Sequence, residues 1–237
     1  MSSPDVLQAI VDESARVEQR KIAAKKALAV RILITLAALT IWFSTQSLLG
    51  ARISPTEGIG DGLHRLTAPV NAYLHRAPRA ANALLITSSA LIDAIAIFLL
   101  GSWIFGGNLR PFLGLGMLLI ARQVLEALCS LPAPPGIIWH NPGFPSLLVT
   151  YGVANDFFFS GHTAIAVFGA IELARLRRAW LTALAVCVVI FEVAAVLVLR
   201  AHYTMDVSTG ALAAVSVAQI CGALSKRFAR FRVQPAE

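Results

Sequence analysis

The stretch WLTALAVCVVIFEVAAVLVLR, residues 180–200, decides the fold of this chain, because Glu192 is the only charged side chain before its last residue, Arg200. A helix needs roughly 20 mostly apolar residues to cross a bilayer. Backbone groups in lipid must be hydrogen-bonded within their own segment, which favours a helix. Five other stretches have the same character: 28–49, 82–105, 111–130, 162–176 and 204–224. The stretch 162–176, the fourth of the six in chain order, is short, and we expect it to extend at both ends. The sequence therefore predicts an all-α integral membrane protein with six transmembrane helices.

The composition excludes an ordinary water-soluble domain. Hydrophobic residues make up 57% of the 237 residues and charged residues only 14%, and the mean hydropathy is +0.71. Soluble domains carry about 25% charged residues. The net charge of +7 gives no support to nucleic-acid binding, because the basic residues flank the apolar stretches.

The same basic residues orient the chain, since Lys and Arg collect on the cytoplasmic side of a membrane. They precede the first stretch, separate the fourth from the fifth and follow the sixth: Arg16, Arg20, Lys21, Lys25, Lys26, Arg175, Arg177, Arg178, Lys226, Arg227, Arg230 and Arg232. We therefore expect both termini in the cytoplasm and residues 131–161, which lack Lys and Arg, on the other side. Residues 50–80 depart from this pattern, because they carry four arginines on the expected outer side.

This pattern divides the chain into a cytoplasmic N-terminal segment (1–26), a six-helix membrane domain (27–225) and a basic cytoplasmic tail (226–237). A turn followed by an interfacial helix is expected around Gly62–Leu74. Residues 131–146, LPAPPGIIWHNPGFPS, hold five prolines, which prevent a continuous helix. We expect an irregular outer cover there.

The motif RAHYTMD, residues 200–206, opens the sixth stretch and places His202 four residues before Asp206. On a helix the two would share one face. A carboxylate beside an imidazole fixes its tautomer and stabilises its protonated form, leaving the other nitrogen free as a nucleophile or base. A surface ion pair is the alternative for this pair taken alone.

The motif SGHT, residues 160–163, opens the fourth stretch. Ser160 suits a helix N-cap, Gly161 permits close approach, and a helix start attracts phosphate. His162 would lie beside whatever binds there. A capped helix with an interfacial histidine is the commoner meaning of this motif alone.

In the expected topology these two motifs meet at one membrane surface, close to the end of the third stretch. Two imidazoles, an orienting carboxylate and an anion-binding helix start suit phosphoryl transfer. One imidazole attacks phosphorus, the other protonates the leaving oxygen, and N–H groups hold the phosphate charge.

Taken together, these residues resemble the type-2 phosphatidic acid phosphatase superfamily, and within it the sphingomyelin synthase-like branch. The resemblance covers roughly residues 80–225 and keeps the order and spacing of its motifs. It is carried by Arg122, LPAP (131–134), NDFFFSGHT (155–163) and HYTMDV (202–207).

The resemblance implies a six-helix fold and a catalytic triad of His162, His202 and Asp206 facing the non-cytoplasmic side. It implies that a phosphocholine- or phosphoethanolamine-type group leaves a glycerophospholipid, forms a phosphohistidine on His202 and passes to a lipid alcohol such as ceramide or diacylglycerol. The alternative is a lipid phosphate phosphatase or phospholipase-C-like hydrolase in which water is the acceptor. No metal or other cofactor is expected, and homo-oligomerisation is left open.

The phosphatase branch carries an Arg six residues before its second histidine, where this chain has Val196. A phosphodiester has one charge and needs less compensation than a monoester, so diester transfer is favoured. Ser160, Gly161 and Arg122 are candidate phosphate-binding residues, and Arg200 could restore part of the missing cationic clamp. Asp156, Phe157 and Phe159 could hold a cationic head group, or they could form an interfacial aromatic belt with a solvated Asp156.

Asp93, Arg122, Glu126 and Glu192 are charged residues that lie inside the apolar stretches. Intramembrane charges are costly and usually paired, and Arg122 lies one turn from Glu126. A transporter or lipid scramblase would use such charges as a pathway, but such proteins often show inverted repeats or broken helices, and we find neither in the sequence.

Overall fold

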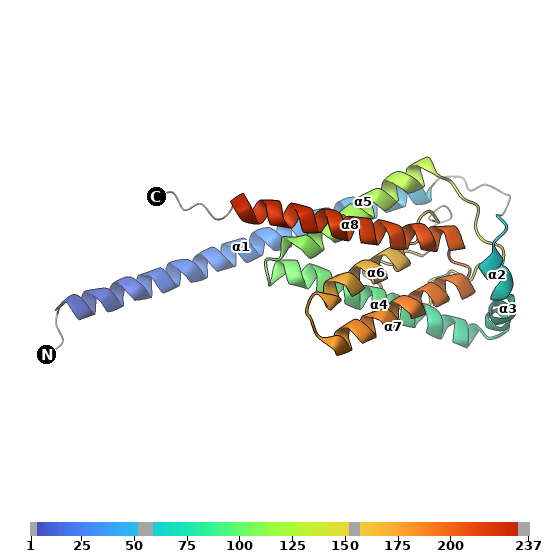
Figure 1. The fold of residues 1–237 in the computed structure, drawn as a ribbon, viewed down its shortest axis with the longest axis horizontal. Coiled ribbons are helices and arrows are strands. Elements are labelled where there is room, and N and C mark those ends of the chain that lie inside the picture. Colours follow the sequence, from blue (N-terminus) through green and yellow to red (C-terminus); the bar gives the residue numbers. More distant parts are fainter. Residues whose placement is uncertain (1–3, 52–58, 152–156, 232–237) are drawn as a thin grey trace.

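The computed structural model describes residues 4–51, 59–151 and 157–231. Every regular element in these ranges is an α-helix (Figure 1). The helices are α1 (Pro4–Gly50), α2 (Gly62–Leu66), α3 (Ala68–Arg76), α4 (Pro78–Ile104), α5 (Leu109–Leu128), α6 (Gly161–Ala174), α7 (Ala179–Val198) and α8 (Thr204–Phe231).

Five segments of the described chain are helices long and apolar enough to cross a membrane: Glu13–Leu48, Pro78–Ile104, Leu109–Leu128, Ala179–Val198 and Thr204–Leu224. The expected short fourth span is α6, which has 14 residues and a length of about 21 Å. The expectation that this helix extends beyond residues 162–176 at both ends is wrong. It ends at Ala174, and Arg177 shortly afterwards has a positive φ of 55°.

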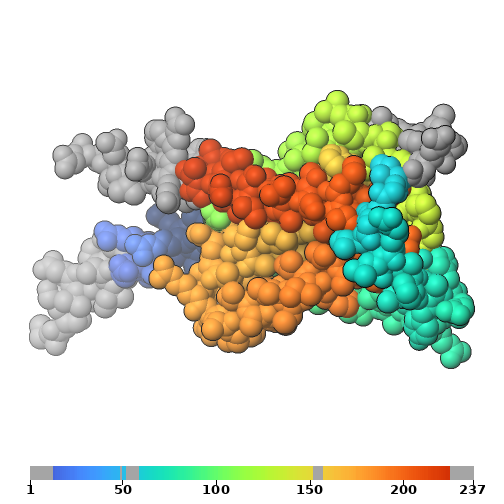
Figure 2. Space-filling view, turned by 45° about the vertical axis from the view of Figure 1, so that its right-hand side comes forward, coloured from blue at the N-terminus to red at the C-terminus, as the bar shows by residue number. Residues whose placement is uncertain are grey.

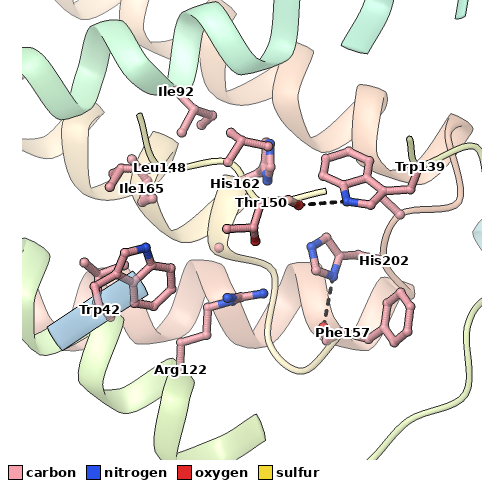
Figure 3. A pocket seen from close by; sticks show the side chains of 14 residues that line it. Trp42, Ile92, Arg122, Trp139, Leu148, Thr150, Phe157, His162, Ile165 and His202 are labelled. Atoms are coloured by element: carbon pink, nitrogen blue, oxygen red, sulfur yellow. Dashed lines mark hydrogen bonds between the residues drawn. The ribbon is translucent and has the colours of Figure 1, made fainter. Parts of the chain in front are cut away.

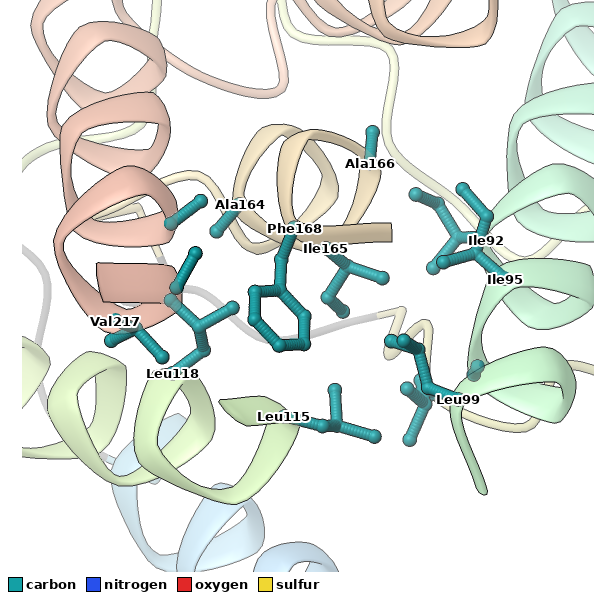
Figure 4. Packing of buried hydrophobic residues seen from close by; sticks show 14 of the residues in the cluster. Ile92, Ile95, Leu99, Leu115, Leu118, Ala164, Ile165, Ala166, Phe168 and Val217 are labelled. Carbon is teal, nitrogen blue, oxygen red and sulfur yellow. The ribbon is translucent and has the colours of Figure 1, made fainter. Parts of the chain in front are cut away.

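The short helix α6 lies at the centre of the bundle and contacts α4, α5, α7 and α8. Its Phe168 ring is fully buried and points into the core between α4 and α5 (Figure 4). On the α5 side the approach is so close that a Cβ on Gly114 would lie 2.0 Å from Cζ of Phe168. The neighbouring helices thus enclose α6 and hide most of it from lipid.

At the opposite end of α6 from its N-terminus, a buried ion pair ties three helices together. Nε of Arg110 lies 2.8 Å from Oε1 of Glu172, linking α5 to α6. The Nη2 group of Arg110 also donates to the carbonyl oxygen of Ala218 on α8, at 3.0 Å. Because the pair is enclosed and hydrogen-bonded, it fixes the mutual position of these helices.

The first helix runs without a break from Pro4 to Gly50, so it continues from the N-terminal segment into the first apolar stretch. Its N-terminal half projects beyond the rest of the bundle (Figure 1). The second half packs against α4 and α5.

The single interfacial helix expected around Gly62–Leu74 is wrong, because two short helices, α2 and α3, occupy this region. Pro69 lies in the first turn of α3, and proline has no N–H to continue a preceding helix. Figure 2 shows α2 and α3 covering the end of the bundle where α7 ends and α8 begins, and α2 contacts both of those helices. The expected irregular cover is confirmed, since the described residues between Cys129 and Ser160 contain no helix.

Gly210 on α8 permits the close approach of α8 to the start of α6. A Cβ at this position would lie 2.6 Å from the carbonyl oxygen of Ser160. We therefore expect Gly210→Ala to lower the free energy of unfolding by about 1–3 kcal/mol, as overpacking does elsewhere, measured by thermal unfolding of the purified protein in lipid nanodiscs. The matched control is Gly116→Ala, because no atom lies within 4 Å of a Cβ there. Equal melting temperatures for the two variants would contradict the prediction.

Candidate active site

One partly enclosed pocket brings together side chains from segments far apart in sequence. It has a volume of ≈40 Å³ and lies beside the N-terminus of α6. Figure 3 shows His162, His202 and Arg122 around a common space, with Trp42 at one end and Trp139 at the other. The lining residues are Trp42, Ile92, Leu119, Arg122, Trp139, Leu148, Val149, Thr150, Phe157, Gly161, His162, Ile165, Ala201 and His202.

His162 is held in the first turn of α6. Ser160 caps this helix as the sequence predicts, with its hydroxyl accepting from the backbone N–H of Thr163 at 3.3 Å. The imidazole is 7% exposed and lies edge-on to the Trp139 ring, with 5.3 Å between ring centroids. Its Nε2 atom has no hydrogen-bond partner among the described residues. A buried imidazole nitrogen with no protein partner is available to a bound substrate.

His202 is oriented by a backbone carbonyl. Its Nδ1 lies 2.9 Å from the carbonyl oxygen of Phe157. Because a carbonyl only accepts, Nδ1 carries the hydrogen in this bond and Nε2 of the neutral ring is left with a free lone pair. The second ring nitrogen faces the middle of the pocket (Figure 3).

Asp206 lies close to His202, but the two residues do not share one face of a helix as their spacing predicts. Helix α8 begins at Thr204, so His202 precedes it and the expectation of a shared helix face is wrong. Oδ2 of Asp206 accepts from the backbone N–H of Tyr203 at 2.8 Å and lies 3.8 Å from Nδ1 of His202. The carboxylate therefore caps the start of α8, as an acidic residue in a first turn does, and acts on the imidazole through its charge.

A backbone hydrogen bond joins the two histidine-bearing segments. The N–H of Ser160 donates to the carbonyl oxygen of Asp206 at 3.1 Å. It holds the loop before α6 against the first turn of α8, so His162 and His202 reach the same pocket.

Arg122 enters the pocket from α5 with its guanidinium already engaged. It pairs with Glu126 at 2.7 Å, which confirms the predicted one-turn pairing. Nε donates to the carbonyl oxygen of Phe159 at 3.0 Å, and Nη1 donates to Oε1 of Gln46 at 3.4 Å. A Cβ on Gly161 would lie 3.2 Å from Nε of Arg122. The cation thus lies directly against the start of α6.

The remaining candidate residues lie in different surroundings. Arg200 donates to the carbonyl oxygens of Pro135 at 3.0 Å and His64 at 2.8 Å, so its guanidinium joins the loop at Pro135 to α2. Phe157 lines the pocket, whereas the fully buried ring of Phe159 packs in the main hydrophobic core. Asp156 lies outside the described residues. The predicted roles of these residues in phosphate and head-group binding stay predictions.

Comparison with known proteins places the chain in a family. The family model AtPDCT1/2 matches residues 61–223. This chain belongs to the AtPDCT1/2 family. It is also 22% identical over 157 residues to phosphatidylcholine:diacylglycerol cholinephosphotransferase 1 of Arabidopsis thaliana, a match that covers 66% of this chain and 51% of the relative. The chain therefore spans about half the length of that relative. No solved structure matches it.

The AtPDCT1/2 match contains α2 to α7 and most of α8, with every site residue predicted from the sequence. Helix α1 lies before it, although Trp42 of α1 lines the pocket and Gln46 contacts Arg122. Together with the five apolar helices, the family supports an integral membrane protein.

A second network outside the pocket was not anticipated from the sequence. Nε2 of His64 donates to the carbonyl oxygen of His202 at 2.9 Å. Asp61, where the AtPDCT1/2 match begins, accepts from Thr204 N and Oγ1 at 2.6 and 2.7 Å. Its Oδ1 also caps α2 by accepting from Leu63 and His64. Asp61 directly before α2 could have been recognised as an N-cap, but nothing local indicates its contact with Thr204.

Asp93 fastens the loop that covers the pocket. Its carboxylate accepts from the backbone N–H groups of Leu147 at 2.8 Å and Leu148 at 3.1 Å, and from the hydroxyl of Ser146 at 3.2 Å. The segment Leu148–Thr150 lines the pocket. This intramembrane charge therefore serves as an acceptor for a loop. Glu192 differs, because its Oε2 accepts from Ser88 between α7 and α4 at 2.7 Å.

Among the residues that the structure describes, no group of three or more His, Cys, Asp or Glu side chains could hold a metal ion.

The loop latch gives a testable prediction. We expect Asp93→Ala to cost about 1–3 kcal/mol of stability, because three donors lose a buried acceptor, and to speed hydrogen exchange at the amides of Leu147 and Leu148. Asp93→Asn keeps one acceptor oxygen and should lie between Asp93→Ala and the wild type. Unchanged exchange at these two amides in Asp93→Ala would show that the carboxylate does not hold the loop.

The contact between α2 and α8 should depend on pH. Burial raises the pKa of Asp61, but hydrogen bonds from Thr204 and from the start of α2 outweigh it and leave the pKa below the ordinary value of 3.8. A carboxyl with a lowered folded pKa stabilises the fold above its ordinary pKa and loses that contribution as the pH falls through the folded value. Thermal unfolding from pH 5 downwards should therefore show a loss of stability at the acidic end that Asp61→Asn lacks. The same acid slope in both proteins would contradict this assignment.

Proposed function

We propose that this protein is a membrane lipid phosphotransferase of the sphingomyelin synthase-like type. It moves a phosphocholine- or phosphoethanolamine-type group from a glycerophospholipid to a lipid alcohol such as diacylglycerol or ceramide. The observation that carries the proposal is the single pocket lined by His162, His202 and Arg122. The relative's name supports phosphatidylcholine as donor and diacylglycerol as acceptor, the first pair to test.

In the proposed mechanism His202 is the nucleophile. Its Nε2 attacks the phosphorus of the donor, and the bond from phosphorus to the diacylglycerol oxygen breaks. His162, protonated at this stage, gives its proton to that departing oxygen. The products of this half-reaction are diacylglycerol and a phosphohistidine.

The second half-reaction reverses these roles. Neutral His162 takes the proton from the acceptor hydroxyl, and the acceptor oxygen attacks the phosphohistidine. The phosphorus–nitrogen bond breaks, so that His202 is regenerated and His162 is again protonated. In the hydrolytic alternative water replaces the lipid alcohol and the head group leaves as a soluble phosphomonoester.

Positive charge around the pocket suits the phosphate. Arg122 supplies a buried guanidinium, and the N-terminus of α6 contributes the positive end of its dipole. Asp206, 3.8 Å from Nδ1 of His202, would stabilise the imidazole as it gains positive charge. The pocket of ≈40 Å³ is far below the roughly 300–1,000 Å³ of ligand sites, so binding a whole head group requires its lining segments to separate.

The proposal includes a membrane arrangement. Helix α6 serves as the fourth crossing along the chain and brings the number of crossings from five to six. An even number of crossings puts both termini on the cytoplasmic side, and the pocket opens toward the periplasm or lumen, as the basic residues indicate.

The test is the product spectrum of the purified protein in liposomes. Phosphatidylcholine labelled in its choline group is mixed with diacylglycerol of distinguishable acyl chains, with ceramide, or with neither. A transferase moves label onto the new lipid backbone. Exclusive release of water-soluble phosphocholine would show that the protein is a hydrolase and would contradict the proposed transferase.

The two histidines should give different defects. We expect His202→Ala to abolish transfer, because the nucleophile is lost, and His162→Ala to lower kcat by about 100-fold to 10,000-fold, the usual contribution of a general acid–base. The matched control is His75→Ala, an exposed histidine of α3 that should keep wild-type rates. Full activity in His202→Ala would eliminate the phosphohistidine route.

A further inference from the structure

An apolar groove between α1 and α5 adjoins the candidate active site. Its volume is ≈320 Å³, within the roughly 300–1,000 Å³ range of small-molecule sites. Its lining is almost entirely apolar: Thr35, Ala38, Leu39, Ile41, Trp42, Thr45, Leu100, Phe112, Leu115, Gly116, Leu119, Ile120, Gln123 and Val124.

Two side chains connect this groove with the catalytic pocket. Trp42 and Leu119 line both. A neighbouring groove between α1 and α4, of ≈290 Å³, contains neither of them. Of these two grooves, only the α1–α5 groove therefore shares lining residues with the pocket that holds the two histidines.

Trp42 stands at the junction with an unused donor. Its side chain is 6% exposed, and its indole Nε1–H has no hydrogen-bond partner in the described chain. The guanidinium carbon of Arg122 lies 6.0 Å from the centre of its ring. A buried indole N–H without an acceptor is costly. A bound molecule that brings a carbonyl oxygen to this N–H gains a hydrogen bond, and the N–H has already been removed from water.

We propose that the α1–α5 groove binds one acyl chain of a diacylglycerol moiety, whose ester carbonyl accepts from Trp42 Nε1–H. The moiety is common to a phospholipid donor, its released diacylglycerol and a diacylglycerol acceptor. The chain lies in the groove, the ester lies at Trp42, and the glycerol oxygen reaches the space between His162 and His202. This inference rests on the proposed function for the reaction that it serves.

The first test fills the groove. Gly116 lines it, and no atom lies within 4 Å of a Cβ there, so the side chain of Gly116→Leu starts in open space and extends into the groove. We expect kcat/KM for long-chain diacylglycerol to fall about tenfold or more, because several methylenes lose their burial, while a short-chain diacylglycerol is used at the wild-type rate.

The matched control is Gly101→Leu, which places a side chain in the neighbouring α1–α4 groove, where a Cβ would meet only Phe105 Cδ2 at 3.9 Å. This variant should retain wild-type rates with both lipids. Equal loss in Gly116→Leu for long and short chains, or equal loss in the two variants, would overturn the assignment of the groove.

The second test removes the donor. Trp42→Phe keeps an aromatic ring but lacks the N–H. The wild type should prefer an ester-linked diacylglycerol over the ether-linked dialkylglycerol, which has no carbonyl, by about fivefold to tenfold, as expected for one hydrogen bond. Trp42→Phe should use both at one rate. A preference that survives in Trp42→Phe would overturn the role of Trp42.

The third test needs no turnover and so separates this inference from the reaction. Wild-type protein in liposomes is exposed to a diacylglycerol with a photoreactive group on one acyl chain, and the labelled peptides are mapped. Labelling concentrated on the groove residues of α1 and α5, competed by unlabelled diacylglycerol and lost in Gly116→Leu but not Gly101→Leu, supports the site even if no transfer is found. Labelling spread evenly over the lipid-facing helices, or unaffected by Gly116→Leu, refutes it even if transfer is found.

Discussion

The hydrogen bond from Ser160 N–H to the carbonyl oxygen of Asp206 is the contact on which the site depends. It joins the loop before α6 to the first turn of α8. Each partner has a further role at its own helix end, since the Ser160 hydroxyl caps α6 and the Asp206 carboxylate accepts from Tyr203 N–H. Two helix starts are therefore satisfied and held together by the same two residues. The imidazoles on either side of this junction, His162 and His202, consequently share one pocket.

The rest of the bundle keeps that junction in place. The missing side chain at Gly210 lets α8 approach Ser160, and the Arg110–Glu172 pair fixes the other end of α6 against α5. Asp61 and His64 attach α2 to the backbone around His202 and Thr204. The carboxylate of Asp93 holds the loop whose residues close the pocket. These contacts are mostly hydrogen bonds to backbone groups, which fix positions more rigidly than the long side chains of surface ion pairs do.

The pocket and the groove divide recognition of a lipid between two environments. The pocket is small, carries two imidazoles and one guanidinium, and suits a phosphate. The groove is apolar and suits hydrocarbon, with Trp42 between the two. Helix α1 provides this boundary, although it lies before the segment that the AtPDCT1/2 family model matches. In the proposed function, the family-matched helices supply the chemistry and α1 contributes to the choice of lipid.

The sequence by itself determined the all-helical membrane character, the cap at Ser160, the pairing of Arg122 with Glu126 and the irregular segment around the five prolines. Each depends on residues within one helical turn or on the composition of one segment, so local physics is sufficient. The break of the expected 62–74 helix is also local, and Pro69 could have indicated it. Only the tertiary structure decided that the Phe157 carbonyl orients His202, that Asp61 holds Thr204 and that Asp93 fastens the 146–148 loop. These bonds join residues far apart in the chain to backbone atoms, and any residue except proline offers the same backbone N–H and C=O groups, so no side-chain pattern records which of them will meet.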